Sequence, residues 1–318
     1  MIERPHEVVA AAYNLLLDRD PEPAGLKHWS SALESGLARS EFVRAVLASA
    51  EFRARMAASD TLTRYHDVDL IIPVGGGQFR VPASDLSLVP HLLAHRCWEP
   101  HILSWLTRRL KRTDVFVDVG ANIGYFTVLC APLVARVVAF EPAPGSYGYC
   151  KSNVALNGLT NVELHQFGLW HEDATLEIAR DPSSLMTAAV ATASDGRAVE
   201  PIHAVSLDSL IDRGLDMTRL DVIKMDIEGA EWSALRGMRR TLARFRPAIV
   251  MEVNRPALAA CGATVDDVWT FFAGLSYDVR VFEAWKTRDP DPVRTLEELK
   301  ARCPDDSLVD ILAVPEPH

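Results

Sequence analysis

The apolar positions of the first sixty residues recur at the spacing of an α-helix. Within residues 9–16, and again within 43–50, apolar side chains fall at i, i+3, i+4 and i+7. Residues 24–34 form a third such stretch, which ends before Gly36, since glycine is typical of the position just after a helix. No alternation of apolar and polar residues indicates a strand here. The pattern predicts a small, separate helical domain over residues 1–60.

A polar stretch at 58–66 indicates a linker after these helices. Two short apolar runs, 68–74 and 78–81, flank a turn of three glycines and predict a β-hairpin. Residues 98–110 carry tryptophan, isoleucine and leucine at helical spacing and predict an amphipathic helix. We therefore expect residues 61–113 to form a connecting region made of one hairpin and one helix.

From residue 114 the pattern changes to buried apolar runs that alternate with helical stretches. Continuous apolar runs are typical of parallel strands whose two faces are both covered. The sequence therefore predicts an α/β domain over residues 114–318. Residues 168–180 indicate an exposed hairpin, and residues 181–197, rich in Ala, Ser and Thr, indicate a mobile loop. The expected strands are 115–119, 136–140, 162–167, 221–225, 248–253, 277–282 and 308–314.

Composition and charge argue against several classes of protein. The chain has 318 residues, of which 48% are hydrophobic and 24% charged, as is usual for globular proteins. A net charge of −10 argues against a nucleic-acid partner and against binding to anionic membranes. No apolar run approaches the roughly 20 residues of a membrane span, and the N-terminus lacks the apolar core of a secretory signal. The five cysteines are scattered without a Cys-x-x-Cys pair, so we expect a cytoplasmic protein without a disulfide framework.

The strongest chemical signal is a glycine turn directly after the first strand of the α/β domain. The turn runs from Gly120 to Gly124, where glycine allows close approach of a ligand and the following helix start offers N–H groups. The second strand ends at Phe140 and is followed by Glu141 and Pro142. A carboxylate at that place accepts hydrogen bonds from both hydroxyls of a ribose. The turn, the acid and their spacing together predict a nucleotide-binding site.

The details of the turn favour S-adenosylmethionine over NAD. A dinucleotide site has the pattern G-x-G-x-x-G, whereas here the middle glycine is missing and Asn122 follows in its region. Asp118, just before the turn, repels a pyrophosphate and suits an ammonium group. We therefore expect a donor with an amino-acid head and a nucleoside tail. The candidate donor-binding residues are Asp118, Gly120, Asn122, Gly124, Glu141, Pro142, Gln166, Phe167 and Asp226.

Acidic residues gather where the fourth and fifth strands end. Asp226, Glu228 and Glu252 should lie at the carboxyl edge of the sheet, where open α/β folds bind ligands. We expect these three to be catalytic, either as a general base for an acceptor or as ligands of a divalent cation such as Mg²⁺, although no firm metal site is predicted. Glu231 is equally well explained as a favourable charge at a helix start. If none of these acids acts as the general base, we expect the base to be His165, His171 or His203.

Several segments resemble the FkbM family of S-adenosylmethionine-dependent methyltransferases. The chain is similar to this family over about residues 95–315, and its last predicted strand resembles the family's last strand. The resemblance implies a Rossmann-like class I methyltransferase fold, with a seven-stranded, mostly parallel sheet, helices on both faces and an antiparallel last strand. It also implies O-methylation of a hydroxyl on a sugar, a glycan or a glycosylated or polyketide natural product. The segments that carry the resemblance are 116–124, 139–142, 205–210, 223–231 and 310–315.

The N-terminal helices resemble a short bacterial domain of unknown function that accompanies surface-glycan enzymes and secreted repeat proteins. Residues 13–29 and 49–52 carry this resemblance, which hints at glycan biology, while a dimerisation or packing role is at least as well supported. A small-molecule or glycan acceptor is the expected partner, and a homo-oligomer stays open. Two other functions also stay open, an NAD-dependent oxidoreductase and a non-catalytic nucleotide-binding module. The sequence does not identify the acceptor or its methylated position.

Overall fold

The computed structural model describes most of the chain. The expected linker at 58–66, half of the expected helix at 43–50 and most of the expected loop at 181–197 lie outside the described residues. The described residues are 5–17, 19–37, 42, 45–46, 49–51, 68–85, 87–180, 188–190 and 199–316.

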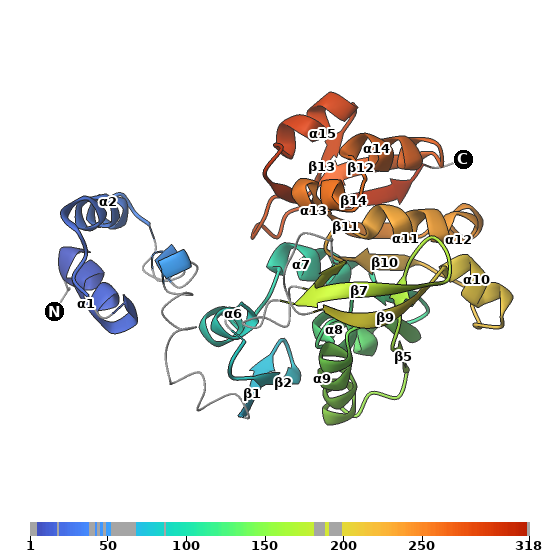
Figure 1. Ribbon diagram of the computed structural model, residues 1–318, viewed down its shortest axis with the longest axis horizontal. Helices are drawn as coiled ribbons and strands as arrows, with labels where there is room; N and C mark the ends of the chain where they lie inside the picture. Colours follow the sequence, from blue (N-terminus) through green and yellow to red (C-terminus); the bar gives the residue numbers. More distant parts are fainter. Residues whose placement is uncertain are drawn as a thin grey trace.

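A mixed sheet of eight strands forms the centre of the molecule (Figure 1). The seven strands expected from the sequence all form, and a short eighth strand, β13, adds to one edge. The neighbouring pairs from β11 through β10, β3 and β4 to β5 are parallel, whereas β14 runs antiparallel to both of its neighbours, β11 and β12. The order along the sheet is β13-β12-β14-β11-β10-β3-β4-β5. The strands are β3 (Val115–Val119), β4 (Arg136–Phe140), β5 (Val162–His165), β10 (Val222–Met225), β11 (Ala248–Asn254), β12 (Tyr277–Val281), β13 (Asp291–Val293) and β14 (Leu308–Pro315).

Both faces of this sheet are covered, which gives the α/β arrangement that the sequence predicts. Successive residues of a strand point to opposite faces, so Phe116 joins one buried hydrophobic cluster and Val117 the other. Continuous apolar strands such as β3 and β10 are the consequence of this double burial. The covering helices include α8 (Tyr125–Cys130), α9 (Pro144–Leu156), α10 (Leu207–Asp212), α11 (Glu231–Gly237), α12 (Arg239–Phe245), α13 (Arg255–Ala260), α14 (Val265–Ala273) and α15 (Leu296–Arg302), with a 3-10 turn, η1, at Ala131–Leu133.

The segment before the main sheet contains the predicted hairpin and an additional helix. Strands β1 (Asp69–Val74) and β2 (Gly77–Pro82) pair antiparallel, as expected. Helix α6 (Leu88–His95) was not predicted, and the predicted amphipathic helix is α7 (Pro100–Arg109). The hairpin shares a hydrophobic cluster with the main sheet, and α9 holds it further, because Asn153 and Asn157 accept hydrogen bonds from the β2 backbone at 2.7 and 2.8 Å.

The N-terminal helices confirm the helical pattern. Helices α1 (Pro5–Leu17) and α2 (Pro23–Glu34) form, and Gly36 follows α2 with a left-handed φ of 101°. Val9, Tyr13 and other apolar residues of this region form a hydrophobic cluster of their own. No helix among the described residues combines the length and the apolarity that a bilayer crossing requires.

A second sheet of four strands replaces the expected exposed hairpin at 168–180, and that prediction is wrong. Strand β7 pairs antiparallel with β8 and β9, while β6 pairs in parallel with β9. This segment is not exposed because one side of β7 is packed against other residues. Its Leu176 and Ile178 lie in a small hydrophobic cluster with Ala143 and Ile202. The order is β6-β9-β7-β8, with β6 (Gly168–Leu169), β7 (Ala174–Arg180), β8 (Ala188–Val190) and β9 (Val199–Val205).

Candidate active site

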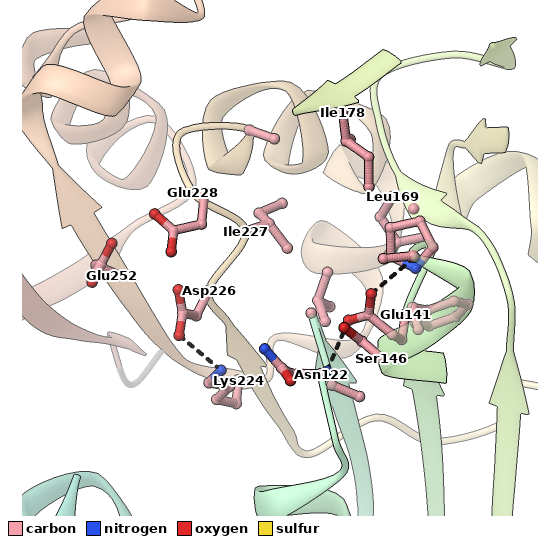
Figure 2. A pocket seen from close by; sticks show the side chains of 18 of the residues that line it. Asn122, Glu141, Ser146, Leu169, Ile178, Lys224, Asp226, Ile227, Glu228 and Glu252 are labelled. Carbon is pink, nitrogen blue, oxygen red and sulfur yellow. Dashed lines mark hydrogen bonds and ion pairs between the residues drawn. The ribbon is translucent and has the colours of Figure 1, made fainter. Parts of the chain in front are cut away.

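A pocket of about 290 Å³ lies where β3, β4, β10 and β11 end, with the second sheet forming part of its wall. Parallel strands place their carboxyl ends at one edge, so side chains far apart in sequence meet there. Figure 2 shows two groups of side chains in this pocket. Asp226, Glu228 and Glu252 lie on one side, Glu141 lies on the other, and Asn122 lies between them. The structure thus brings together most of the predicted site residues.

The glycine turn lies in the pocket wall, but Gly120 is needed for a reason that the sequence did not reveal. Its φ is 78°, and a Cβ added there would lie 2.1 Å from the backbone oxygen of Asp226. The close neighbour of this glycine is therefore the protein's own chain. Gly124 is similar, because its φ is 85° and a Cβ there would lie 2.8 Å from the sulfur of Cys150.

Several backbone N–H groups of the turn already have partners within the chain. The N–H groups of Gly120 and Ala121 donate to the Phe140 oxygen at 2.9 and 3.0 Å. The N–H of Asn122 donates to Glu141, and that of Gly124 donates to the Ala121 oxygen. The turn therefore does not present these N–H groups to a phosphate, unlike the glycine-rich loops of dinucleotide-binding proteins.

Glu141 is held firmly at the pocket wall. Its side chain is 6% exposed, and its two oxygens accept hydrogen bonds from the Asn122 N–H at 2.8 Å and the Ala143 N–H at 2.9 Å. Carboxylate oxygens accept hydrogen bonds from N–H and O–H donors alike, so the chemistry of this side chain suits the hydroxyls of a ligand. Pro142 and Ser146 line the same wall.

Four predicted donor residues, namely Asp118, Gly124, Gln166 and Phe167, lie outside the pocket lining. Asp118 is fully buried and accepts a 2.6 Å hydrogen bond from the Thr127 hydroxyl. Burial raises the pKa of Asp118, against the opposing effects of Lys224 and Thr127. Gln166 is exposed, and Phe167 packs near Phe140. The neighbouring residues that do line the pocket are Gly168, Leu169 and Trp170.

Lys224 and Asp226 form an ion pair in the pocket. The distance from Lys224 Nζ to Asp226 Oδ2 is 3.2 Å, and Lys224 is 4% exposed. Its ammonium also lies 5.1 Å from the centre of the Phe126 ring. Burial alone would lower the pKa of Lys224, but Asp226, Asp118 and Glu99 outweigh it and raise that pKa. Lys224 therefore keeps its charge and holds the Asp226 carboxylate in place.

The other acids of the cluster hold protons more tightly. Burial, together with the charge of Asp226, raises the pKa of Glu228 to about 7. Burial and the surrounding carboxylates raise the pKa of Glu252 to about 10, and its buried Oε1 has no hydrogen-bond partner among the described residues. Glu231 is different, because it does not line the pocket and its Oε1 accepts a 2.9 Å hydrogen bond from the Ile227 N–H.

Neither a metal cluster nor a histidine base is built into the described pocket. Within the described ranges, no group of three His, Cys, Asp or Glu side chains is arranged to hold a metal ion. His165 stacks on the Phe140 ring with their centres 5.2 Å apart, and His171 lies beside Glu172. His203 belongs to β9, and none of these histidines lines the pocket.

Sequence reasoning missed Glu99, which lies just before α7 and lines the pocket beside the other acids. Burial, with Asp310 and Asp226 nearby, raises its pKa well above the ordinary value. The local signal was the pair Glu99-Pro100, which predicts a helix start and carries no indication of a pocket. Trp98 also lines the pocket.

Comparison with known proteins places these features in a family. The sequence model of the methyltransferase FkbM domain matches residues 118–279, which include the glycine turn and the acids at the ends of β4, β10 and β11. A second model, of a domain of unknown function (DUF4214), matches residues 5–56.

Individual relatives are also methyltransferases by name. Methyltransferase 1 of Beauveria bassiana is 29% identical over 38% of this chain and 57% of its own length. The hexuronic acid methyltransferase AglP of Haloferax volcanii is 29% identical over 48% of this chain and 61% of its own length, so the chain spans about three fifths of either relative. Methyltransferase sdnD of Sordaria araneosa is 30% identical over 46% of this chain and 69% of its own length. A solved FkbM methyltransferase structure from Methylobacillus flagellatus aligns with 95% of this chain and 58% of its own, at 14% identity and a TM-score of 0.42.

Proposed function

Because the chain belongs to the methyltransferase FkbM family, we propose that it transfers a methyl group from S-adenosylmethionine to an acceptor hydroxyl. The acceptor is a sugar, a glycan, or a glycosylated or polyketide natural product. The observation that carries this proposal is the pocket itself, with the fixed Glu141 on one side and the acids Asp226, Glu228 and Glu252 on the other. The hexuronic acid specificity named for one relative supports a carbohydrate acceptor.

The residues on the Glu141 side fit S-adenosylmethionine. The Glu141 carboxylate is a hydrogen-bond acceptor that suits ribose hydroxyls, and the apolar side chains of Leu169, Ile178 and Ile202 offer a surface for a purine. The occupied N–H groups of the glycine turn suit a ligand without a pyrophosphate, which argues against the NAD alternative. Asp226 and its neighbours suit the positive charges of the donor. When bound, the donor supplies an electrophilic methyl group on a sulfonium.

The acids on the other side fit the activation of a hydroxyl. A neutral alcohol is a poor nucleophile, so it gains from a base whose pKa lies near the operating pH. Glu228, with a pKa of about 7, meets that condition, and we propose it as the base. Asp226 is held by Lys224, and Glu252 keeps its proton and can donate a hydrogen bond. Alignment of acceptor and donor supplies much of the remaining acceleration.

Donor binding tests the first half of the proposal. Titration calorimetry should show micromolar binding of S-adenosylhomocysteine and no comparable binding of NADH. Glu141→Gln should weaken binding at least tenfold, because a charge-assisted hydrogen bond contributes about 1.5–3 kcal/mol. The exposed Glu177 on β7 provides a matched control, and Glu177→Gln should bind as the wild type does. Tighter binding of NADH, or unchanged affinity in Glu141→Gln, would contradict the assignment of the donor site.

Turnover tests the second half. Release of S-adenosylhomocysteine should be measured with neutral hexosides, hexuronides and polyketide alcohols as acceptors. Methylation of at least one hydroxyl is the expected result. Donor binding without turnover on any hydroxylated acceptor would favour the non-catalytic binding module instead.

A further inference from the structure

The carboxylate of Glu99 does not do what an acid at a helix start usually does. Glu99 is the N-cap residue of α7, a position where a short polar side chain commonly accepts a hydrogen bond from the first turn of the helix. No such side-chain bond forms here. Its backbone is also unusual, with φ 43° and ψ 61° immediately before Pro100, because the residue before a proline normally adopts an extended conformation. The chain accepts this conformation while the side chain lines the pocket.

Two buried carboxyl oxygens in this pocket lack a hydrogen-bond partner among the described residues. One is Oε2 of Glu99, and the other is Oε1 of Glu252 on β11. A buried polar atom without a partner is costly, so such atoms are commonly satisfied by a ligand at functional sites. Because the two oxygens come from separate elements and meet in one cavity, a single ligand with several hydrogen-bond donors can satisfy both.

The segment that carries Glu99 is fixed on both sides. The N–H of Trp98 donates to the Tyr125 hydroxyl at 2.9 Å, and Tyr125 is the first residue of α8, directly after the glycine turn. On the other side, Nδ1 of His101 accepts from the Trp285 N–H at 3.2 Å. The ring proton of neutral His101 is therefore on Nε2, which lies 2.8 Å from Asp310 Oδ2. Glu99 is thus held in place before a ligand binds.

We propose that Glu99 and Glu252 form the acceptor subsite, and that it takes an uncharged, polyhydroxylated ring whose hydroxyls donate to Glu99 Oε2 and Glu252 Oε1. This inference rests on the proposed methyl transfer and names the acceptor class more closely. A hexuronate is disfavoured, because its carboxylate would add a negative charge to a pocket that already holds the Asp226 carboxylate and Glu228. The buried cation among them, Lys224, is bound to Asp226 and does not offset a further negative charge.

A retained proton on Glu252 adds a hydrogen-bond donor to this subsite. The pKa of Glu252 is raised to about 10, so at neutral pH its carboxyl group can donate as well as accept hydrogen bonds, and burial raises the pKa of Glu99 in the same direction. A sugar hydroxyl is itself both a donor and an acceptor, and it matches such a pair of groups.

Paired glycosides test the acceptor class. The methyl glycosides of glucose, galactose and mannose should each be compared with the corresponding hexuronide, which differs by one carboxylate. Binding is measured by saturation-transfer NMR with S-adenosylhomocysteine present, and KM by methyl transfer. At least one neutral glycoside should bind, with its hexuronide at least tenfold weaker. If no neutral glycoside binds at millimolar concentration, or if the hexuronide binds as well, the inference is overturned.

Variants of Glu99 separate contact with the acceptor from a structural role. Glu99→Gln should raise the dissociation constant of the neutral glycoside about tenfold and leave S-adenosylhomocysteine affinity unchanged. Glu22 provides the matched control, since it also precedes a proline at a helix start but is exposed and bound to Arg19. Glu22→Gln should change neither affinity. Unchanged glycoside binding in Glu99→Gln would overturn the role of Glu99.

Glu99→Gly gives a second, independent readout. Glycine adopts a positive φ readily, so this variant should melt at the same temperature as the wild type or higher, while glycoside binding falls. A residue with a structural role alone would give a lower melting temperature with glycoside binding intact. If the wild type does not bind S-adenosylhomocysteine, the proposed function itself is contradicted. If it binds S-adenosylhomocysteine but shows no preference for neutral glycosides, only the proposed acceptor subsite is contradicted.

Discussion

At the scale of single residues, four acids in one pocket differ because their neighbours differ. Asp226 has the Lys224 ammonium at 3.2 Å, so its carboxylate has a fixed position. For Glu228, burial and the charge of Asp226 outweigh the opposing effect of Lys224 and raise its pKa to about 7. Glu252 holds its proton more tightly, with a pKa of about 10, and burial also raises the pKa of Glu99. One pocket therefore holds an ion-paired acid, an acid that titrates near neutral pH and an acid that keeps its proton there.

Glu228 should be required for turnover and not for donor binding. Glu228→Gln should lower kcat by about 10²-fold or more, the usual scale for a lost acid–base group. In the wild type, kcat should rise with pH through a limb near 7, because Glu228 accepts a proton only after it has lost its own. The limb should be absent from the residual activity of the variant.

A matched variant and a chelator separate the alternatives for this acid. Glu231→Gln is the control, because Glu231 is also buried but lies outside the pocket lining, and an amide oxygen can still accept from the Ile227 N–H. Its kcat should stay at the wild-type level. Activity that is lost in EDTA and restored by Mg²⁺ would show that the acids are metal ligands, and would contradict the role of Glu228 as the base.

The sequence could predict acids that follow strand ends, and it could not predict Glu99. Asp226, Glu228 and Glu252 lie at or just after the ends of β10 and β11, so the rule that parallel strands end at one edge brings them together. Glu99 lies before the main sheet begins, and its place in the pocket depends on how α7 packs. No local pattern encodes that packing, and the positive φ of Glu99 is visible only in the structure.

At the scale of elements, strands surrounded on both faces were the easiest to predict. β3 and β4 have the predicted bounds, because a continuous apolar run needs burial on both sides along its whole length. The expected third strand extended to residue 167, whereas β5 ends at His165 and Gly168 begins β6 of the second sheet. Helix α6 was missed because Pro90 indicates a helix breaker, although a proline in the first turn removes no helical hydrogen bond.

The backbone at Gly120 lies so close to the backbone at Asp226 that an alanine at position 120 should not be tolerated. Gly120→Ala places a Cβ about 2 Å from the Asp226 oxygen, and both are backbone positions that cannot move aside cheaply. We expect a loss of more than about 3 kcal/mol in unfolding free energy, or insoluble protein, beyond the roughly 1 kcal/mol cost of a positive φ. Gly262→Ala is the control, since Gly262 has a φ of 72° with nothing near its Cβ position. Urea denaturation measures both, and equal losses in the two variants would contradict this account.

At the scale of the whole molecule, the hydrophobic clusters indicate how the chain divides. The cluster of α1 and α2 contains only residues from the first fifty, whereas β1, β2, α6 and α7 share a cluster with the main sheet. We propose that residues 1–60 form a separate domain, and that the hairpin region between 61 and 113 is packed as part of the methyltransferase fold that continues from 114 to 318.

Truncation from the N-terminus tests this division. A chain that begins at Thr61 should remain folded and bind S-adenosylhomocysteine as the full chain does, because the described contacts of the first domain form a cluster of their own. A chain that begins at Asp85 lacks β1 and β2, which removes buried side chains such as Phe79 and the two hydrogen bonds between Asn153 and the Arg80 backbone. Circular dichroism and calorimetry should show that only the longer chain folds. Loss of donor binding in the chain from Thr61 would contradict the separation.

The short strand β13 affects how the protein behaves beside other copies of itself. An open strand edge is a template on which a strand from another chain can add, and repeated addition leads to fibrils. β13 covers the edge of β12 with three residues, and its Pro292 has no N–H to offer a newcomer. Asp291 beside it is held by Arg288 and Arg302, which places charge on the same edge. This end of the sheet is therefore a poor nucleus for amyloid-like growth, even in concentrated solution.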